Sequence, residues 1–290
     1  MILVAGATGS LGRKIVDRLL DRGDPVLALV RPASRYASLE QAGAGVIFGD
    51  LTDRDSLDRA CQGVTTVIAT ASVSKTGGDT LERVDLQGNQ HLIAAAQAAG
   101  VRQFIFVSTR NASVDSPAPL FRAKAAAERA LRESPMGWTI LQPGGFMDVW
   151  FPMFIERPAF AGQPVTLVGE SRRRHAFVAE QDVAAFAVAA LDHPAARHAS
   201  IVIGGPEAVT FKDVVREYEQ AAGRSVPVRS VAPGDPIPGV PEAVSRMAAG
   251  LETFDSLIPM EETSRRYGIV LTTVHDFVRA RLAASPDAPA

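Results

Sequence analysis

Gly6, Gly9 and Gly12 are spaced three residues apart and follow directly after the apolar run Ile2–Ala5. The next segment, Leu11–Arg22, has the apolar spacing of an amphipathic helix. A glycine-rich turn from a buried strand into a helix lets the backbone approach a pyrophosphate, and the N–H groups that open the helix bind the anion. The spacing differs from the usual G-x-G-x-x-G, so a purely structural turn is the alternative. The turn's position nevertheless predicts dinucleotide binding.

Apolar runs and helical segments alternate regularly over the first 145 residues. The runs are short and apolar throughout, which is typical of strands buried on both faces of a parallel sheet. This alternation predicts an α/β fold with a doubly wound parallel-sheet Rossmann domain. The predicted strands are Ile2–Ala5, Pro25–Val30, Gly45–Gly49, Thr66–Ala69, Gln103–Val107 and Trp138–Leu141, and the predicted helices are Leu11–Arg22, Leu81–Ala99 and Leu120–Glu133.

The second half of the chain is less regular and predicts a smaller, discontinuous C-terminal substrate lobe. Three prolines interrupt Phe146–Arg174, which is expected to form loops and short elements. Thr210–Ala222 is predicted to be a helix capped by Thr210 and Asp213. Further expectations are a helix at Asp182–Leu191, a strand at Ile201–Ile203 and a surface loop at Pro227–Pro241. The predicted domains are 1–145 with 182–205 for the Rossmann domain, 146–181 with 206–283 for the substrate lobe, and 284–290 for a flexible tail.

Charge and composition exclude several classes of protein. The chain has 30 Lys+Arg against 32 Asp+Glu, without the basic surplus of a nucleic-acid-binding protein. Its single cysteine, Cys61, cannot form an internal disulfide and is expected to pack as a small hydrophobe, and its five histidines have no metal-ligand spacing. There is no signal-peptide pattern after Met1 and no apolar stretch of about 18 residues. We therefore expect a cytoplasmic protein without metal, nucleic-acid or membrane partners.

The residues after the second predicted strand indicate which dinucleotide binds. An NAD-preferring site usually carries an Asp or Glu there, to accept the ribose 2′-hydroxyl. Here the strand ends at Val30 and is followed by Arg31 and Arg35. A guanidinium binds a 2′-phosphate through two parallel hydrogen bonds, which predicts NADP(H) in preference to NAD(H). A solvated loop arginine is the alternative. Asp50, after the third strand, would contact adenine or cap a turn.

The residues at the predicted strand ends occur in an order typical of one family. They include the three glycines, Arg31, Asp50, Val84-Asp85 before Gly88-Asn89, Ser108, Lys124 and Pro143-Gly144-Gly145-Phe146. The chain resembles the atypical short-chain dehydrogenase/reductases, in particular the NmrA-like NAD(P)-binding branch that includes isoflavone-reductase-like enzymes. The resemblance covers residues 1–205 and, more loosely, the remainder. It implies either an NADPH-dependent reductase or a non-catalytic sensor of the cofactor's redox state.

The family resemblance also implies which residues are catalytic. A typical short-chain dehydrogenase uses Tyr-x-x-x-Lys, in which the tyrosine donates a proton and the lysine lowers its pKa. Lys124 matches the lysine, but Leu120 stands in place of the tyrosine and has no proton to give. Lys124 would then bind the ribose or transfer the proton itself, with an exposed helix lysine as the alternative. Ser108 and Asn111 are further catalytic candidates that would polarise a carbonyl, or are ordinary turn residues.

Most of the predicted cofactor contacts lie at the carboxyl ends of the predicted strands, where this topology binds a dinucleotide. An apolar cluster after the last of them packs in a core or lines a pocket for a small hydrophobic or aromatic substrate. The predicted cofactor-binding residues are Gly6, Thr8, Gly9, Ser10, Leu11, Gly12, Arg31, Arg35, Asp50, Leu51, Ala69, Thr70, Ala71, Lys124, Pro143, Gly144, Gly145 and Phe146, and the predicted substrate-binding residues are Met147, Trp150, Phe151 and Phe154.

These residues together predict an NADPH-dependent oxidoreductase. Its substrate would be a small hydrophobic or aromatic carbonyl, a quinone or a conjugated alkene. Two alternatives remain open. One is a non-catalytic NADP(H)-binding regulator, which Leu120 favours, and the other is a redox-neutral isomerase or cyclase that uses the bound cofactor as a scaffold. A monomer or a homodimer is expected.

Overall fold

The structure is a computed structural model that describes residues 1–73 and 78–284. It divides into two compact units. Unit 1 consists of Met1–Pro143 and Glu180–Ile203, and unit 2 consists of Gly144–Ala179 and Gly204–Ala290. Of the tail that the sequence predicts to be flexible, 284–290, all but Ala284 lies outside the described residues.

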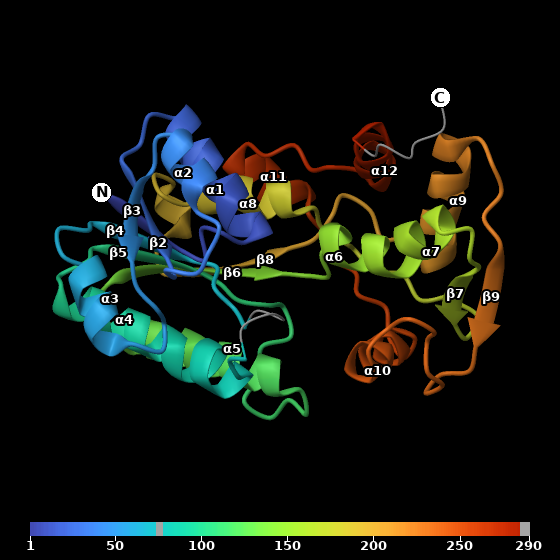
Figure 1. Ribbon diagram of the computed structural model, residues 1–290, viewed down its shortest axis with the longest axis horizontal. Helices are drawn as coiled ribbons and strands as arrows, with labels where there is room; N and C mark the ends of the chain where they lie inside the picture. The colour runs from blue at the N-terminus through green and yellow to red at the C-terminus, as the bar shows by residue number, and fades with distance from the viewer. Residues whose placement is uncertain (74–77, 285–290) are drawn as a thin grey trace. The chain divides into compact units, whose positions relative to one another are not determined.

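Unit 1 is built on a seven-stranded parallel sheet with the order β3-β2-β1-β4-β5-β6-β8. The chain winds outward from β1 to β3 and then, starting at β4, in the opposite direction, which is the doubly wound arrangement. The predicted α/β Rossmann fold is therefore confirmed (Figure 1). The strands are β1 (Ile2–Ala5), β2 (Val26–Val30), β3 (Gly45–Phe48), β4 (Thr66–Ala69), β5 (Gln103–Val107), β6 (Gly137–Pro143) and β8 (Ala199–Ile203).

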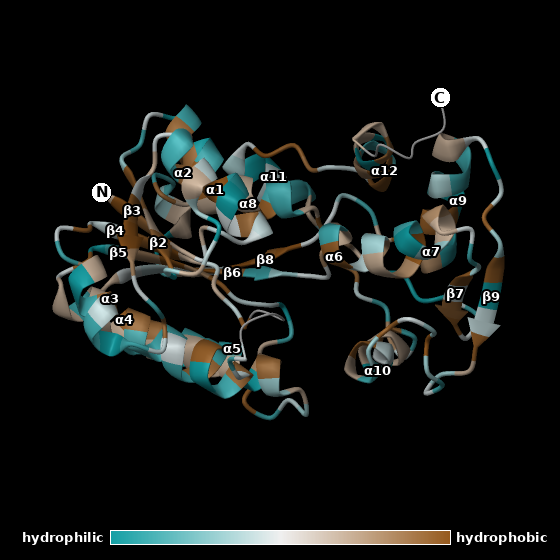
Figure 2. Cartoon of the chain, in the orientation of Figure 1, coloured by the Kyte–Doolittle hydropathy of each residue, from teal (hydrophilic) through white to brown (hydrophobic). Residues whose placement is uncertain are grey.

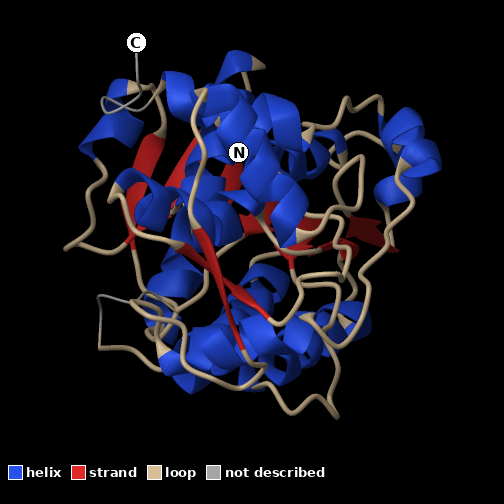
Figure 3. Ribbon diagram, turned by 90° about the vertical axis from the view of Figure 1, so that its right-hand side faces the viewer, coloured by secondary structure: helices blue, strands red, loops and turns tan. Residues whose placement is uncertain are grey.

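Helices cover both faces of this sheet (Figure 3). Helices α1 and α8 pack together on one face, and α3, α4 and α5 lie on the other (Figure 1). The strands are largely apolar, whereas the helices carry both apolar and polar residues (Figure 2). The helices of unit 1 are α1 (Ser10–Asp21), α2 (Ala37–Gln41), α3 (Arg54–Ala60), the π-helix η1 (Glu82–Gly88), α4 (Asn89–Ala98), α5 (Pro119–Glu133), α8 (Glu180–Ala189) and the 3-10 helix η3 (Pro194–Ala196).

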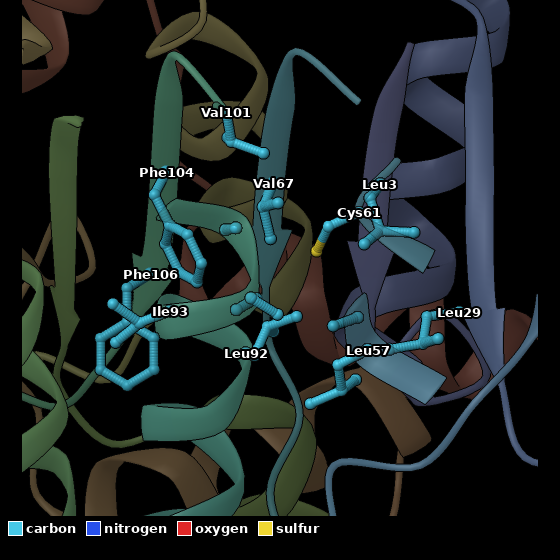
Figure 4. Close-up of a cluster of buried hydrophobic side chains, with 14 of the residues drawn as sticks. Leu3, Leu29, Leu57, Cys61, Val67, Leu92, Ile93, Val101, Phe104 and Phe106 are labelled. Carbon is cyan, nitrogen blue, oxygen red and sulfur yellow. The ribbon is translucent and has the colours of Figure 1, made fainter. Parts of the chain in front are cut away.

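The core between the sheet and α3–α5 is formed by alternate strand residues and by the inner faces of these helices (Figure 4). Leu3, Val67 and Phe104 face this side of the sheet, and Leu57 and Leu92 come from the helices. Cys61 is fully buried among them, as the sequence predicts for a small apolar residue, and burial raises the pKa of its thiol to about 11. This packing fixes the strand ends that carry the predicted cofactor residues.

Unit 2 contains a parallel pair of strands, β7 and β9, and a separate apolar core. The loop predicted at Pro227–Pro241 is wrong for Val228–Val231, which forms β9. Three of its four residues are exposed, so no apolar pattern marks it. The predicted capping box of α9 is confirmed at Thr210 and Asp213.

The helices and strands of unit 2 are α6 (Met147–Phe151), the π-helix η2 (Pro152–Glu156), α7 (Arg157–Phe160), β7 (Val165–Val168), α9 (Phe211–Ala222), β9 (Val228–Val231), α10 (Glu242–Leu251), α11 (Glu261–Tyr267) and α12 (Val274–Ala283).

His175 is buried in unit 2, with 3% of its surface exposed. Its backbone pairs with Val209, and its ring packs near Phe177 and Phe254. In the described part of the chain neither ring nitrogen has a hydrogen-bond partner. Burial lowers the pKa of His175, and the nearby Leu251 backbone and Asp255 only partly oppose this shift. The folded protein therefore holds His175 in its neutral form.

The neutral state of His175 predicts that stability falls as the pH is lowered. Because its pKa is lower in the folded than in the unfolded chain, the unfolded chain binds the extra proton first, below about pH 6.5. The free energy of unfolding should then decrease by up to about 1.4 kcal/mol per pH unit. Urea unfolding at pH 7.5 and 5.5 measures this loss. His175→Leu should flatten it and the exposed-site variant His275→Gln should not, and a slope that persists in His175→Leu contradicts the prediction.

Candidate functional site

The glycine loop turns from β1 into α1 too tightly for side chains at two of its glycines. Gly6 has a φ of +87°, and a Cβ atom there would lie 2.5 Å from Thr70 Oγ1 and 2.8 Å from the backbone nitrogen of Ala71. A Cβ atom at Gly12 would lie 2.1 Å from the carbonyl oxygen of Gly6. The loop therefore packs directly against the segment that follows β4. Two groups of predicted cofactor residues are brought together here.

The start of α1 presents backbone donors without a side-chain cap. Gly9 is the N-cap, donates its N–H to the carbonyl of Gly6 at 3.0 Å and accepts from the N–H of Arg13 at 2.9 Å. The first N–H groups of a helix have no partner within the helix, and the helix dipole places partial positive charge on them. Thr8, Gly9 and Ser10 are exposed at this turn. These residues fit the pyrophosphate of a dinucleotide.

Lys14 and Glu180 extend this end of α1 and were not identified from the sequence. Lys14 Nζ lies 2.8 Å from Ser10 Oγ and 2.7 Å from Glu180 Oε2, and Ser10 Oγ also donates to Glu180. The pair joins α1 to the start of α8 within unit 1. The Lys14 ammonium lies one helical turn beyond the predicted anion site. Lys14 and Glu180 are far apart in the sequence, and only the fold brings them together.

Arg31 and Asp50 follow β2 and β3, as predicted. The Arg31 guanidinium lies 3.0 Å from Asp79 Oδ2, and Arg35 is exposed nearby in the chain. Asp50 Oδ1 accepts hydrogen bonds from the N–H and the hydroxyl of Thr52, at 2.8 and 2.7 Å. Turn capping therefore accounts for one carboxylate oxygen of Asp50. Contacts from Arg31 to a 2′-phosphate and from Asp50 to adenine stay predictions.

Leu51 follows Asp50 and is buried. A Cβ atom at Gly88 would lie 2.7 Å from its Cβ, so η1 approaches the segment after β3 closely. Ala69 is the buried last residue of β4, and Ala71 is half-buried. The Thr70 hydroxyl donates to the carbonyl of Ala5 at 3.1 Å. The backbone of these residues thus borders the glycine loop.

Lys124 is buried inside unit 1 beside the fully buried Asp85. Its Nζ lies 3.7 Å from Asp85 Oδ1, donates to the carbonyl of Val107 at 3.3 Å and lies 5.0 Å from the centre of the Phe106 ring. Burial lowers the pKa of Lys124, and Asp85 and the more distant Glu128 oppose that shift. The alternative of an exposed helix lysine is wrong. A buried lysine with a lowered pKa is suited to proton transfer.

Asp85 connects Lys124 to the segment that follows β4. Its carboxylate accepts hydrogen bonds from Ser72 Oγ and, at 2.8 Å, from the N–H of Val73. Asn89 Nδ2 donates to the Asp85 carbonyl at 2.9 Å. Asp85 stands in one of the motifs that carry the family resemblance, but the sequence alone assigns it no role. The π-helix η1 places it in the interior instead.

Ser108 and Asn111, the other catalytic candidates, have different surroundings from Lys124. The Ser108 hydroxyl is buried and donates to Glu128 Oε1 at 2.5 Å, and Glu128 also accepts from Gln142 and Arg132. Asn111 is exposed in the turn after β5. Among the described residues, neither is hydrogen-bonded to Lys124. The Ser108 proton is already used within the protein, which favours a structural role for this hydroxyl.

The predicted turn Pro143–Phe146 lies where the chain passes from unit 1 into unit 2. In unit 1 the carbonyl of Pro143 accepts from the N–H of Arg110 at 3.0 Å. In unit 2 the carbonyl of Gly145 accepts from the N–H of Val178 at 2.9 Å. Gly144, Gly145 and Phe146 are all partly exposed. Their contact with a cofactor stays a prediction.

The predicted substrate-binding residues belong to the core of unit 2. Met147 and Phe151 expose no surface, and Phe154 exposes 5%, so core packing accounts for these three. Trp150 is half-buried and stacks on Phe154 with ring centres 5.3 Å apart. Trp150 is therefore the member of this cluster that keeps surface available for a ligand.

Neither a metal site nor a membrane-spanning helix is found in the described ranges. Residues 1–73 and 78–284 contain no group of three or more His, Cys, Asp or Glu side chains that could hold a metal ion. No helix within these same ranges is both long and apolar enough to cross a bilayer.

Gly12→Ala tests the glycine loop. The new Cβ would overlap the Gly6 carbonyl, so the start of α1 must shift. We expect NADPH to bind about tenfold more weakly, a loss of about 1.4 kcal/mol. Cofactor fluorescence titration measures the affinity. Gly250→Ala, at a helical glycine of α10 with open space around it and an ordinary φ, is the control. Unchanged NADPH affinity in folded Gly12→Ala would contradict the assignment of the loop.

The strand order and the glycine loop at the start of α1 define a dinucleotide-binding protein of the doubly wound class. The model of the NAD(P)H-binding family matches residues 6–194, and the chain belongs to this family. The resemblance to the NmrA-like atypical short-chain dehydrogenase/reductases is thereby confirmed.

Named relatives include both reductases and an assembly factor. The chain is 32% identical over 232 residues to the NAD(P)H azoreductase of Xenophilus azovorans, covering 80% of this chain and 77% of the relative. It is 31% identical over 230 residues to the photosystem II assembly factor Ycf39 of Trieres chinensis, covering 79% and 72%. The structure of the NADPH-dependent quinone oxidoreductase QOR2 from Escherichia coli, complexed with NADPH, superimposes with a TM-score of 0.81 at 23% identity, covering 97% and 99%. This last likeness shows a shared fold.

Proposed function

We propose that this protein is an NADPH-dependent oxidoreductase that reduces a small hydrophobic or aromatic carbonyl, quinone or conjugated alkene. The observation that carries the proposal is the buried Lys124, held between Asp85 and the end of β5 at the position of the family's lysine. Burying a lysine side chain is costly, and buried ionisable groups with shifted pKa values cluster at functional sites. The burial of Lys124 next to the proposed dinucleotide site therefore favours a functional role over a structural one. The azoreductase and quinone oxidoreductase among the relatives support the same class of reaction.

Each part of the candidate site has a role in this proposal. When bound, NADPH supplies the hydride that reduces the substrate. The N–H groups at the start of α1 bind the pyrophosphate, and Arg31 with Arg35 favours NADP(H) over NAD(H) through the 2′-phosphate. Lys124 Nζ donates to a ribose hydroxyl or to the oxygen that gains charge on the substrate.

The decay of NADPH absorbance against a panel of acceptors tests the proposal. The panel contains quinones, azo dyes, enones and aryl ketones, and NADPH binding is measured separately by fluorescence. Decay that depends on an acceptor supports the reductase. Tight binding of NADPH and NADP⁺ with no decay on any acceptor would overturn it.

A non-catalytic NADP(H)-binding regulator is the second candidate. Leu120, near the start of α5, has no proton to donate, and the Ser108 hydroxyl is committed to Glu128. Both observations reduce the acid–base groups available to an enzyme. The assembly factor among the relatives is consistent with such a role. A regulator should bind both redox forms of the cofactor and change its partners or conformation without turnover.

A further inference from the structure

An ion pair joins the end of β2 to the segment that immediately precedes η1. Arg31 directly follows β2, and Asp79 lies ten residues after Ala69, the last residue of β4. Because β1 lies between β2 and β4 in the sheet, a pair from one to the other spans the end of β1. Arg31 Nη1 lies 3.0 Å from Asp79 Oδ2, and the side chains are 42% and 16% exposed. The carboxylate is thus the more buried partner.

Asp79 lies where a dinucleotide-binding site can use a carboxylate to recognise the ribose. Sites that take NAD(H) use a carboxylate beside the second strand to accept the ribose 2′-hydroxyl. No acid occurs between Asp24 and Glu40, so β2 and the residues that follow it supply none. Asp79 brings a carboxylate to the Arg31 guanidinium from the β4 side instead.

The same carboxylate acts against a 2′-phosphate. A phosphate bound to Arg31 would lie within a few ångströms of Asp79, and two like charges at that distance repel each other. The guanidinium has five N–H donors, so it can keep its bond to Asp79 while it contacts the ribose. The energetic balance between the two cofactors therefore depends on Asp79 as well as on Arg31.

We propose that Asp79 is a specificity-determining residue for the dinucleotide. Its carboxylate accepts a hydrogen bond from the 2′-hydroxyl of NAD(H) and disfavours the 2′-phosphate of NADP(H). Arg31 and Asp79 together let one site take both cofactors, with a preference for NADPH that is smaller than Arg31 alone would give. This inference rests on the proposed cofactor site and concerns which dinucleotide it takes.

Dissociation constants of NADPH and NADH, measured by cofactor fluorescence without any acceptor, test the inference. In Asp79→Asn the ratio of the NADH constant to the NADPH constant should rise about tenfold, because NADPH binds more tightly and NADH more weakly. Asp79→Ser removes the charge with a smaller side chain and should shift the ratio in the same direction. Arg31→Gln should lower the ratio. Glu82→Gln removes one exposed negative charge three residues further along and should change the ratio less than twofold.

The outcome separates this inference from the reductase proposal. If both Asp79 variants retain the wild-type melting temperature and change the two affinities by the same factor, or by none, Asp79 is a structural contact and the inference is overturned. A wild-type protein that binds neither cofactor overturns it as well. Because no acceptor is present, failure to find a reducible substrate contradicts the reductase and does not alter the binding ratio.

Discussion

Lys124→Met is expected to lower kcat for acceptor reduction about 100-fold or more, while the dissociation constant of NADPH changes less than about tenfold. A 100-fold loss corresponds to about 2.7 kcal/mol of transition-state stabilisation. Methionine keeps the apolar stem beside the Phe106 ring but removes the cation that faces Asp85. The measurement is steady-state NADPH oxidation together with fluorescence titration of the cofactor.

Lys212→Met, on the exposed surface of α9, is the matched control and should leave kcat unchanged. A Lys124→Met enzyme that binds NADPH and keeps more than about a third of kcat would contradict the catalytic role. NADPH binding by the variant also shows that the site has folded.

The pH profile distinguishes proton donation by Lys124 from a structural role. Burial lowers the pKa of Lys124. Activity that needs the protonated amine should therefore be lost at a lower pH than the pKa of an ordinary lysine, which is about 10.4. Asp85 opposes that shift, and Asp85→Asn should therefore move the alkaline limb to still lower pH. A variant that loses rate equally at every pH would indicate that Asp85 only holds the segment after β4 in place.

The fold of unit 1 was predictable because its signals are local. Apolar runs such as Ile2–Ala5 and Thr66–Ala69 are buried along their whole length, so composition alone marks them as strands. The glycine loop was predictable because backbone geometry demands glycine at Gly6 and Gly12. In unit 2 the strand Val228–Val231 was missed, because its one partner strand and its mostly exposed side chains leave no apolar pattern.

The candidate site was less predictable, because its polar residues meet only through the fold. Lys124 was identified through the family resemblance, by its place in the Tyr-x-x-x-Lys pattern. Its partner Asp85 lies on a π-helix, and no sequence pattern marks it as buried. The pairs Lys14–Glu180 and Arg31–Asp79 join residues that are 166 and 48 positions apart. Such pairs leave no local pattern. Charged groups of this kind decide the chemistry, whereas backbone and apolar patterns decide the fold.

The core of unit 2 holds a buried carboxylate that predicts a large stability effect. Glu156 is 4% exposed and accepts from the Tyr218 hydroxyl at 2.5 Å. Arg281 binds both of its oxygens, at 3.1 and 2.7 Å. The carboxylate therefore joins η2, α9 and α12. Its charge is balanced by Arg281, the member of this group with about half of its side chain exposed.

Arg281→Met is expected to lower the free energy of unfolding of unit 2 by about 3 kcal/mol, because it leaves Glu156 charged and buried without its partner. Glu156→Gln should lower the free energy of unfolding by less, because the amide oxygen still accepts a hydrogen bond from Tyr218 and the half-exposed Arg281 remains solvated. Urea unfolding followed by fluorescence measures both, in a Trp138→Phe background where Trp150 alone reports on unit 2. The double variant Glu156→Gln with Arg281→Met should recover part of the loss. If Glu156→Gln proves more damaging than Arg281→Met, desolvation of the unpaired carboxylate does not govern the stability of this site.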